Sequence, residues 1–194
     1  PMTILPSVFD NISHFGPLAR TIGDSIAFMA AAAGSDDADI SSLPLPFVVD
    51  RAQAGSLGGR RFALSLDFGY YRVEAPVQAA ILAAVEQLRA AGATVELVDI
   101  GWSRAVNDQW YDLWCVFMAA FFGDAIDGYR ERMDPIVIEL IERGLGLSAT
   151  VYKRVELLRT AMWLDLAAIL ARYDALLCPT CAVTAPSADA DDND

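Results

Sequence analysis

Residues 62–100 read FALSLDFGYYRVEAPVQAAILAAVEQLRAAGATVELVDI, and this stretch decides the fold. Residues 62–67 follow the period-two pattern that is typical of a strand. Pro76 opens a helix near its first turn, Gly92 ends that helix, and residues 94–100 predict a second strand. A strand, a helix and a strand over about forty residues form a βαβ unit, so we expect two parallel strands joined by a crossover helix.

The chain after this unit carries helical patterns over residues 103–172. Asp134 followed by Pro135 predicts the start of a short helix, and Gly144 predicts its end. Ser148 predicts the cap of the next helix. Aromatic side chains recur at helical spacing in the first part of this region: Trp110, Trp114, Phe117 and Phe121.

A short buried strand is predicted at residues 175–178. The sequence therefore predicts an α/β chain: part of a mixed β-sheet flanked by α-helices, with the βαβ unit at about 62–100 and a helical region at about 103–172. We expect residues 1–186 to form a single partial α/β domain. The acidic residues 187–194 predict a disordered tail.

The segment FDNISHFGPLARTIGD at residues 9–24 predicts a loop, a turn and a capped helix. Gly16 and Pro17 mark the turn, because proline fixes φ and glycine permits conformations that other residues avoid. Thr21 is placed to cap the helix by accepting a hydrogen bond from the amide of Asp24. Four residues are interpreted as a structural motif that clamps the loop onto the helix through an arginine–aspartate pair: Gly16, Pro17, Arg20 and Asp24.

Four segments together resemble the amidase signature family. The opening segment carries the pattern G-P-x-x-R-T-x-x-D ahead of an apolar helix, and residues 59–64 are similar to the family strand kGlrIGv. Residues 91–96 are similar to its helix-to-strand step L-x-x-x-G-A-x-V. Residues 173–180, followed by Ala185 and Pro186, are similar to yDvLltPT…aP. These landmarks occur in the family's order and span almost the whole chain.

The resemblance implies a mechanism that uses a serine nucleophile, a second serine in a cis peptide and a lysine, in a Gly- and Ser-rich loop whose amides stabilise the oxyanion. The sequence has no such loop. Ser41 and Ser42 have no neighbouring glycines, and Ser56 lies in a linker before a strand. Lys153 lies beside Arg154 on a helix face. The resemblance is therefore to a late, C-terminal-half segment that lacks the catalytic core. We assign no catalytic residue and expect the chain alone to be inactive.

In the family, the helical insertion after the βαβ unit helps to wall the acyl pocket. The resemblance therefore implies Trp110, Tyr111 and Trp114 as substrate-binding residues, whereas the residues alone also fit an aromatic stripe packed into a core. It also implies a segment of an amide (C–N, non-peptide) hydrolase or of an amidotransferase A-subunit-like protein, which forms part of the sheet and of the pocket wall. The alternatives are a non-catalytic α/β structural or partner-binding domain and an independent small-molecule-binding α/β domain.

Composition limits the partners. The net charge is −12 and Lys153 is the single lysine, which argues against nucleic acid. Hydrophobic residues make up 55% and the mean hydropathy is +0.34, but the most apolar runs, 26–33 and 116–122, are too short to span a membrane. We expect as partner the remainder of the amidase core or a second copy of the chain, docked on an exposed apolar surface. A small amide would be the substrate of the complete enzyme.

Three cysteines, an odd number, argue against a disulfide framework and favour a reducing, cytoplasmic location. Cys178 and Cys181 have the CxxC spacing of redox pairs and half zinc sites, but no helix pattern follows them. Only His14 and Cys115 remain as His or Cys ligands for a metal. We therefore interpret the CxxC sequence as an ordinary strand end, expect no metal and no cofactor, and interpret His14 as a hydrogen-bonding loop residue.

Overall fold

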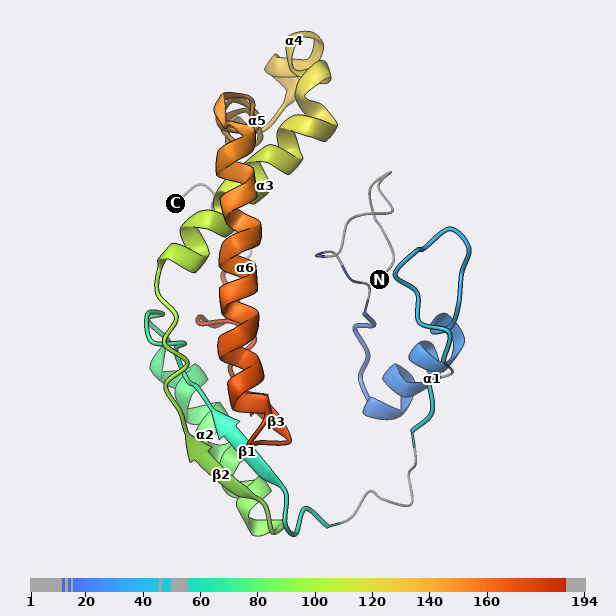
Figure 1. Cartoon of the computed structure of the whole chain (residues 1–194), viewed down its shortest axis with the longest axis vertical. Helices are drawn as coiled ribbons and strands as arrows, with labels where there is room; N and C mark the ends of the chain where they lie inside the picture. The colour runs from blue at the N-terminus through green and yellow to red at the C-terminus, as the bar shows by residue number, and fades with distance from the viewer. Residues whose placement is uncertain (1–11, 13, 15, 46, 50–55, 188–194) are drawn as a thin grey trace. The chain divides into compact units, whose positions relative to one another are not determined.

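The chain forms two compact units, and each can be described by itself. The computed structural model describes residues 12, 14, 16–45, 47–49 and 56–187. Internal contacts separate unit 1, residues 1–55, from unit 2, residues 56–194 (Figure 1). The expectation of one partial domain over residues 1–186 stays a prediction. The predicted acidic tail lies, from residue 188 onward, outside the described residues.

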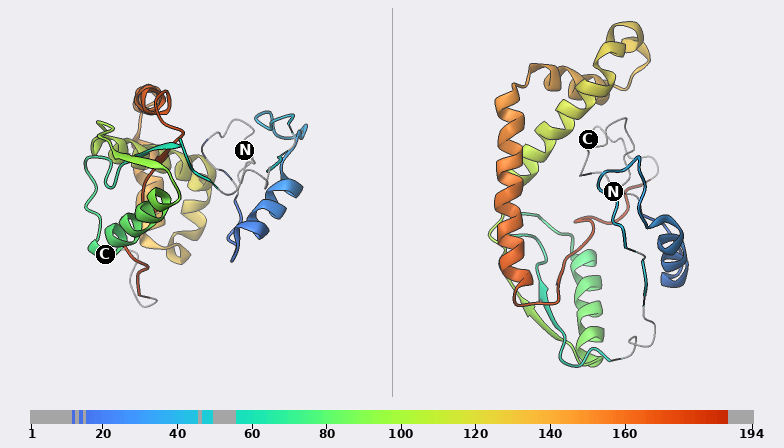
Figure 2. Two further views of the ribbon diagram at one scale, coloured as in Figure 1. Left: turned by 90° about the horizontal axis from the view of Figure 1, so that it is seen from below. Right: turned by 45° about the vertical axis from the view of Figure 1, so that its right-hand side comes forward.

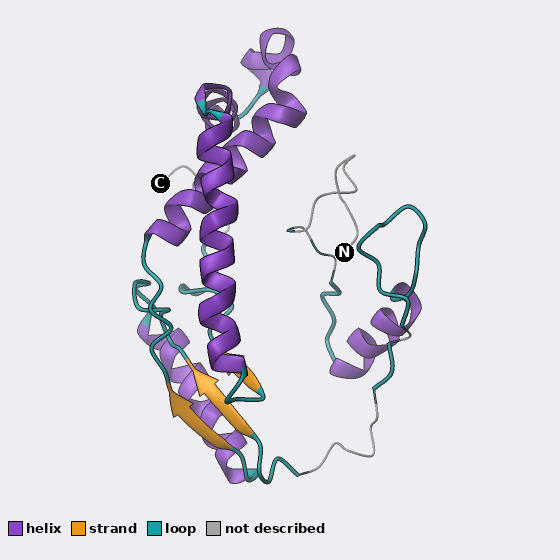
Figure 3. Cartoon of the chain, viewed as in Figure 1, coloured by secondary structure: helices purple, strands orange, loops and turns teal. Residues whose placement is uncertain are grey.

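Unit 2 is built on a small parallel sheet. Its strands are β1 (Arg61–Leu64), β2 (Thr94–Leu97) and β3 (Ala175–Leu177), in the order β2-β1-β3 (Figure 3). The predicted βαβ unit is confirmed, because β1 and β2 pair in parallel with Phe62 opposite Val95. The strands are shorter than the sequence patterns suggested, and β3 is half-buried rather than buried.

Helices cover both faces of this sheet, which confirms the α/β class. Successive side chains of a strand point to opposite faces. Leu64 therefore packs with Val85 of α2 (Ala75–Ala90), while Ala63 packs with Ile169 of α6 (Ala149–Leu170). The right-hand view of Figure 2 shows the sheet between these two helices. As predicted, Pro76 lies in the first turn of α2, and the last turn gives way to Gly92 at φ +100°.

The predicted helical region is confirmed, and its helices run between β2 and β3. They are α3 (Ala105–Phe122), the short turns η2 (Gly123–Ala125), α4 (Ile126–Tyr129) and η3 (Arg130–Arg132), then α5 (Pro135–Gly146) and α6. The predicted caps form: Asp134 accepts from the Ile136 amide at 3.0 Å, and Ser148 accepts from the Val151 amide at 3.3 Å. None of the described helices is both long and apolar enough to cross a membrane.

Gly144 corrects one prediction. It does not end its helix, since α5 continues to Gly146. Instead it is buried where α5 crosses α3, and a Cβ on it would lie 2.0 Å from the carbonyl oxygen of Cys115. Only glycine allows the two backbones to approach this closely. The residue that looked like a helix stop is therefore a packing site.

Unit 1 contains the helix α1 (Ile22–Ala32), capped as predicted. The hydroxyl of Thr21 accepts from the Asp24 amide at 3.1 Å and donates to the Asp24 carboxylate at 2.9 Å. Thr21 is thus a partner of the Asp24 carboxylate, and the structural role expected for Arg20 and Asp24 stays a prediction. No residue of α1 is buried.

Candidate functional site

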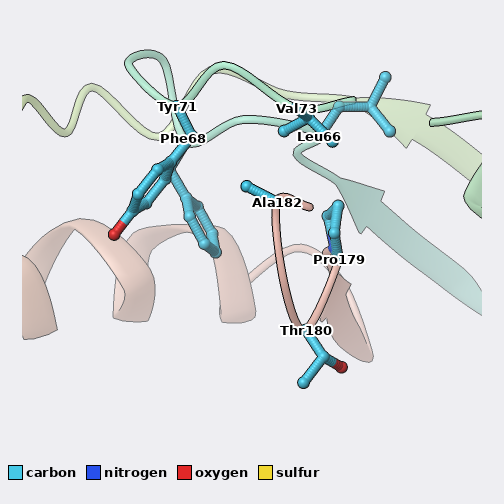
Figure 4. A pocket seen from close by; sticks show the side chains of 7 residues that line it. All are labelled: Leu66, Phe68, Tyr71, Val73, Pro179, Thr180 and Ala182. Carbon is cyan, nitrogen blue, oxygen red and sulfur yellow. The ribbon is translucent and has the colours of Figure 1, made fainter. Parts of the chain in front are cut away.

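A pocket of about 230 Å³ opens at the carboxyl edge of the sheet, between the loops that follow β1 and β3. In open parallel sheets, ligands bind outside the carboxyl ends of the strands, where the connections diverge. Here β1 has β2 on one side and β3 on the other, so its loop and the β3 loop frame such a place. Figure 4 shows the lining residues: Leu66, Phe68, Tyr71, Val73, Pro179, Thr180 and Ala182.

The β1 loop is a tight, strained turn. The buried hydroxyl of Ser65 accepts from the Phe68 amide at 3.2 Å, and Asp67 accepts from the Gly69 amide at 2.8 Å. Phe68 has φ +50°, the only positive φ of a non-glycine residue in the described part of the chain. Such strain in a bulky residue persists only when its surroundings enforce it. The ring of Phe68 is held against Trp102, with centroids 5.2 Å apart.

A carboxylate ties the two pocket walls together. Glu74, just before α2, donates its amide to the carbonyl of Ala182 at 2.8 Å. Its side chain accepts from both the amide and the hydroxyl of Thr184, each at 2.9 Å. The amide bond from Thr184, followed by the hydroxyl bond, holds the pKa of Glu74 below its ordinary value. This contact, called the Glu74 latch below, joins the chain after β1 to the chain after β3.

The chemistry of the pocket suits binding rather than bond-making. The described lining residues include no acid, lysine, histidine or cysteine. The Tyr71 hydroxyl donates to the side chain of Asn107 on α3 at 3.0 Å. Burial raises the pKa of the neighbouring Tyr70 above its ordinary value, so that phenol stays neutral. Mostly apolar walls with a few hydroxyl groups are typical of a small-molecule site.

Cys178 and Cys181 flank Pro179 and Thr180 at this edge, and both are free thiols. Burial raises the pKa of Cys178, which disfavours the thiolate that redox or metal chemistry needs. The residues after Cys181 are not helical, as expected. Across the described ranges, no group of three or more His, Cys, Asp or Glu residues is placed to hold a metal. The interpretation as a strand end therefore agrees with the local structure.

The amino edge of the same sheet is a charged cluster. Asp174 accepts from the Arg61 amide and from the side chain of Arg60, both at 2.8 Å. The Tyr173 hydroxyl donates to Glu96 at 2.5 Å, and Arg61 donates to the same carboxylate at 3.2 Å. The guanidinium of Arg61 also lies 5.0 Å from the centre of the Tyr173 ring.

These contacts shift the pKa values of the cluster in the direction expected for satisfied ions. The Tyr173 hydroxyl, followed by Arg61, holds the pKa of Glu96 below its ordinary value. The Arg61 amide, followed by the Arg60 side chain, does the same for the pKa of Asp174. Hydrogen bonding to Glu96 raises the pKa of Tyr173. The amino edge thus joins all three strands through charged hydrogen bonds.

The three residues that the resemblance assigned to substrate binding do not line this pocket. Trp110 and Trp114 stack with centroids 6.1 Å apart on one face of α3 and are 50% and 38% exposed. Tyr111 is half-buried on another face, under the guanidinium of Arg143 at 5.1 Å. The exposure of the two tryptophans does not fit a fully packed core stripe. Their substrate role stays a prediction.

The remaining candidate groups have structural partners. His14 Nδ1 lies 2.7 Å from the carbonyl of Ile12, a loop hydrogen bond as expected. The Ser42 hydroxyl contacts both the amide and the carbonyl of Asp36, and the Ser56 hydroxyl accepts from the Gly58 amide. Lys153 is paired with Glu156 on the exposed face of α6. In the motif of unit 1, Gly16, Arg20 and Asp24 are exposed and Pro17 is half-buried.

Comparison with known proteins identifies the family. The family model described as Amidase matches residues 3–194. The chain belongs to the amidase family. It is 28% identical over 191 residues to an acylamidase of Rhodococcus erythropolis, covering 94% of this chain and 39% of that protein. It is 29% identical over 201 residues to the A subunit of a glutamyl-tRNA(Gln) amidotransferase from Exiguobacterium, covering 90% of this chain and 42% of that protein.

A solved structure supports the same family assignment as the sequence relatives. A bacterial aryl acylamidase of the amidase signature family superposes with a TM-score of 0.80 at 25% identity, covering 95% of this chain and 40% of that one. The chain therefore spans about two fifths of the length of the relatives it matches. The resemblance inferred from four segments is confirmed.

The sequence patterns pointed to the pocket wall formed by the β3 loop but not to the wall formed by the β1 loop. Pro179 and Thr180 belong to the segment that resembles yDvLltPT, whose Tyr173 and Asp174 hold the opposite edge of the sheet. The β1 loop carries no dinucleotide-binding motif, so its sequence predicted no site. The signal that could have found it was an aromatic cluster around Gly69 directly after a strand: Phe68, Tyr70 and Tyr71.

Proposed function

We propose that this chain forms part of the sheet and of the substrate-pocket wall in an amide (C–N, non-peptide) hydrolase or an amidotransferase A-subunit-like protein. The observation that carries the proposal is the family match over residues 3–194, with a fold that superposes on an aryl acylamidase. The serine nucleophile, its cis-serine partner and the lysine would come from sequence outside these 194 residues. The whole enzyme would acylate that serine and then hydrolyse the acyl-enzyme.

The proposal includes substrate contacts from α3. Trp110 and Trp114 present stacked, partly exposed rings, as a surface that meets an apolar substrate group requires. In the complete enzyme, Trp110→Ala and Trp114→Ala should raise KM about tenfold with little change in kcat, because they remove binding that ground and transition states share. The matched control is Tyr129→Ala in α4, an aromatic residue 54% exposed that lies outside α3 and α6. An unchanged KM in both α3 variants would remove these residues, and Tyr111 with them, from the proposed site.

The proposal also names a partner, the remainder of the amidase core. Leu157, Trp163 and Leu164 of α6 are 66%, 60% and 63% exposed, although α6 also packs on the sheet with its other face. Figure 1 shows α6 running along the helical region down to β3. Large apolar side chains gathered in this way mark a docking surface. The three free cysteines, Cys115, Cys178 and Cys181, support a reducing, cytoplasmic location.

Sedimentation of the 194-residue chain tests this partner. Coexpression with the rest of its reading frame should give a complex, and Leu157→Glu with Leu164→Glu should weaken it. Arg159→Glu, an exposed position on the opposite side of the helix from Leu157 and Leu164, serves as the control. A stable dimer of the chain that excludes the remaining part would favour a self-associating, non-catalytic domain instead.

A direct test of the function compares two proteins. The 194-residue chain should hydrolyse no simple amide and should not react with a serine-directed fluorophosphonate. The product of the complete reading frame should hydrolyse amides and be labelled at one serine outside these residues. Stoichiometric labelling of a serine within the chain would contradict the proposal, and so would a complete product that is inert toward amides and glutamine.

A further inference from the structure

Two free thiols at the carboxyl edge of the sheet have no part in the proposed function. Cys178 directly follows β3, Cys181 lies three positions later, and both are exposed. We propose that Cys178 and Cys181 are a reversible oxidation site, which a small disulfide such as oxidised glutathione converts into an internal disulfide. The inference does not depend on amide hydrolysis, since it needs only these two thiols and the loop between them.

The loop between the two thiols is short and turns back on itself. Figure 4 shows the chain reversing direction between Pro179 and Ala182, with Thr180 at the turn. Cys178 precedes Pro179 on one arm of this turn, and Cys181 precedes Ala182 on the other. The thiols therefore lie on opposite arms, at the CxxC spacing that redox pairs use.

Backbone hydrogen bonds fix both arms of the turn. The carbonyl of Leu177 accepts from the Ser65 amide at 3.0 Å, and the carbonyl of Ala182 accepts from the Glu74 amide at 2.8 Å. Residues 178–181 therefore connect two fixed points. Because groups that are already held close lose less freedom when they react, the internal disulfide is favoured over a bond to a second molecule.

The third cysteine of the chain differs from this pair in exposure. Cys115 is fully buried where α3 crosses α5, and burial raises the pKa of its thiol. Glutathione does not reach a thiol that is closed off from solvent. Exposure therefore makes the oxidation selective for Cys178 and Cys181, and Cys115 serves as an internal control.

The chemistry proceeds by two thiol–disulfide exchange steps. Burial raises the pKa of Cys178, so this residue is a thiol at rest and the first attack falls to Cys181. The Cys181 thiolate attacks one sulfur of oxidised glutathione, forms a mixed disulfide and releases one glutathione thiolate. Cys178 then gives its proton to solvent, and its sulfur attacks Sγ of Cys181 and releases the second glutathione thiolate. The protein is oxidised by two electrons, and one glutathione disulfide is reduced to two thiols.

The internal disulfide closes a ring around Pro179 and Thr180, which line the pocket. A ring of this kind restricts the motion of the loop, so oxidation stiffens one wall of the pocket and reduction releases it. A reducing compartment keeps the pair as thiols, and the bond forms when oxidised glutathione accumulates.

The test is oxidation of the 194-residue chain with oxidised glutathione, followed by alkylation, proteolysis and mass spectrometry. We expect the peptide that carries Cys178 and Cys181 to lose the mass of two hydrogens and to take up no alkyl label. Dithiothreitol should restore both thiols. Cys115 should stay reduced, so that the unfolded protein has one reactive thiol in place of three.

Hydrogen exchange measures the effect on the pocket wall. The Glu74 amide, which donates to Ala182, should exchange about threefold more slowly in the oxidised protein. The control is the Thr94 amide, which donates to Arg60 at the opposite edge of the sheet and should exchange at an unchanged rate. An unchanged rate at Glu74 would contradict the stiffening of the wall.

Single variants separate the two exchange steps. Cys178→Ser lacks the second thiol and should stop at the mixed disulfide, with one glutathione on Cys181. Cys181→Ser should react at least about fivefold more slowly, because Cys178 must then attack first. Cys115→Ala should form the internal disulfide as the wild type does. If Cys115→Ala does not fold, the alkylated Cys115 peptide of the wild type supplies the same control.

The outcomes separate this inference from the proposed function. Three free thiols after oxidation would overturn it, and so would stable glutathione adducts on both exposed cysteines or dimers joined by a disulfide. A complete protein that hydrolyses no amide but forms the internal disulfide would leave this inference in place. A complete protein that hydrolyses amides but keeps both thiols under oxidised glutathione would overturn this inference alone.

Discussion

The two edges of one sheet differ in kind. At the amino edge, Asp174 accepts hydrogen bonds from Arg60 and Arg61, and Glu96 accepts hydrogen bonds from Arg61 and Tyr173, over 2.5–3.2 Å. At the carboxyl edge, apolar side chains and a strained turn surround an open pocket. The three strands therefore have a cluster of charged hydrogen bonds at their amino ends, called the amino-edge seam below, and an open pocket at their carboxyl ends.

This difference separates stability from recognition. A charged group that already has its partners has little left to offer a ligand, so the amino edge fixes strand register. Burial of apolar surface in the carboxyl-edge pocket is still incomplete, and an aromatic residue is held at positive φ there. Strain of this kind is retained where the surrounding structure serves a function. If this division holds, changes at the amino edge should lower stability and leave the pocket at the carboxyl edge unchanged.

The largest effect on stability is expected away from both edges, at the crossing of α3 and α5. A Cβ at Gly144 would lie 2.0 Å from the Cys115 carbonyl oxygen and 2.7 Å from the Ala119 Cβ. Gly144→Ala should therefore destabilise by about 3 kcal/mol, and lower Tm by about 6–12 °C. Gly146→Ala in the same helix meets nothing within 4 Å and should be neutral or slightly stabilising. Equal Tm values for the two variants in a thermal melt would show that the helices do not cross closely.

The second-largest loss of stability is expected when acid protonates the carboxylates of the amino edge. The pKa values of Glu96 and Asp174 are lowered in the folded state. Their contribution to stability is therefore fully present above the unfolded values of about 4.3 and 3.9, and is lost as pH falls through the lower folded values. Tm measured from pH 6 to pH 2 should fall several degrees further for the wild type than for a Glu96→Gln, Asp174→Asn double variant. Parallel Tm curves for the two proteins would mean that the seam is not coupled to folding.

Removing one carboxylate of the seam should have a smaller effect than protonating both. Asp174→Ala leaves the Arg61 amide and the Arg60 guanidinium without their shared acceptor. We expect Tm to fall by about 2–4 °C. The amide NMR shifts of the pocket residues at the other edge should stay at their wild-type positions, because no contact of the pocket changes. The control is Asp165→Ala on the exposed side of α6. Displaced pocket resonances in Asp174→Ala would contradict the division between the two edges.

Much of this fold could be predicted because local signals agreed with one another. Pro76 and Gly92 bounded a helix whose apolar spacing matched its buried face, and Asp134 and Ser148 capped helices as expected. These features depend on residues a few positions apart. The prediction at Gly144 was wrong because a glycine late in a helix pattern fits a stop as well as a crossing, and the deciding contact, with Cys115, is distant in sequence.

The candidate site was less accessible from sequence for the same reason. Its walls come from residues 66–73 and 179–182, and neither segment alone forms a pocket. Their meeting depends on β3 pairing with β1 and on the Glu74 latch, contacts between residues more than one hundred positions apart. Trp110 and Trp114 were placed on one face correctly, whereas Tyr111 lies on another because 3.6 residues per turn separate neighbours by about 100°.

The smallest effect on stability, and the sharpest test of the comparison, is expected at the Glu74 latch. Glu74→Gln keeps an acceptor for Thr184 but removes the charge that strengthens both bonds. Because this side chain is exposed to solvent, Tm should fall by no more than about 2 °C. Hydrogen exchange at the Thr184 amide should speed up by about twofold or more, since the β3 loop that carries Ala182 becomes less ordered. The control is Glu86→Gln on α2, whose carboxylate pairs with Arg89 one turn away on the exposed helix surface. A variant that loses stability while the Thr184 amide exchanges at the wild-type rate would place the latch with the amino-edge seam, as a stabilising contact alone.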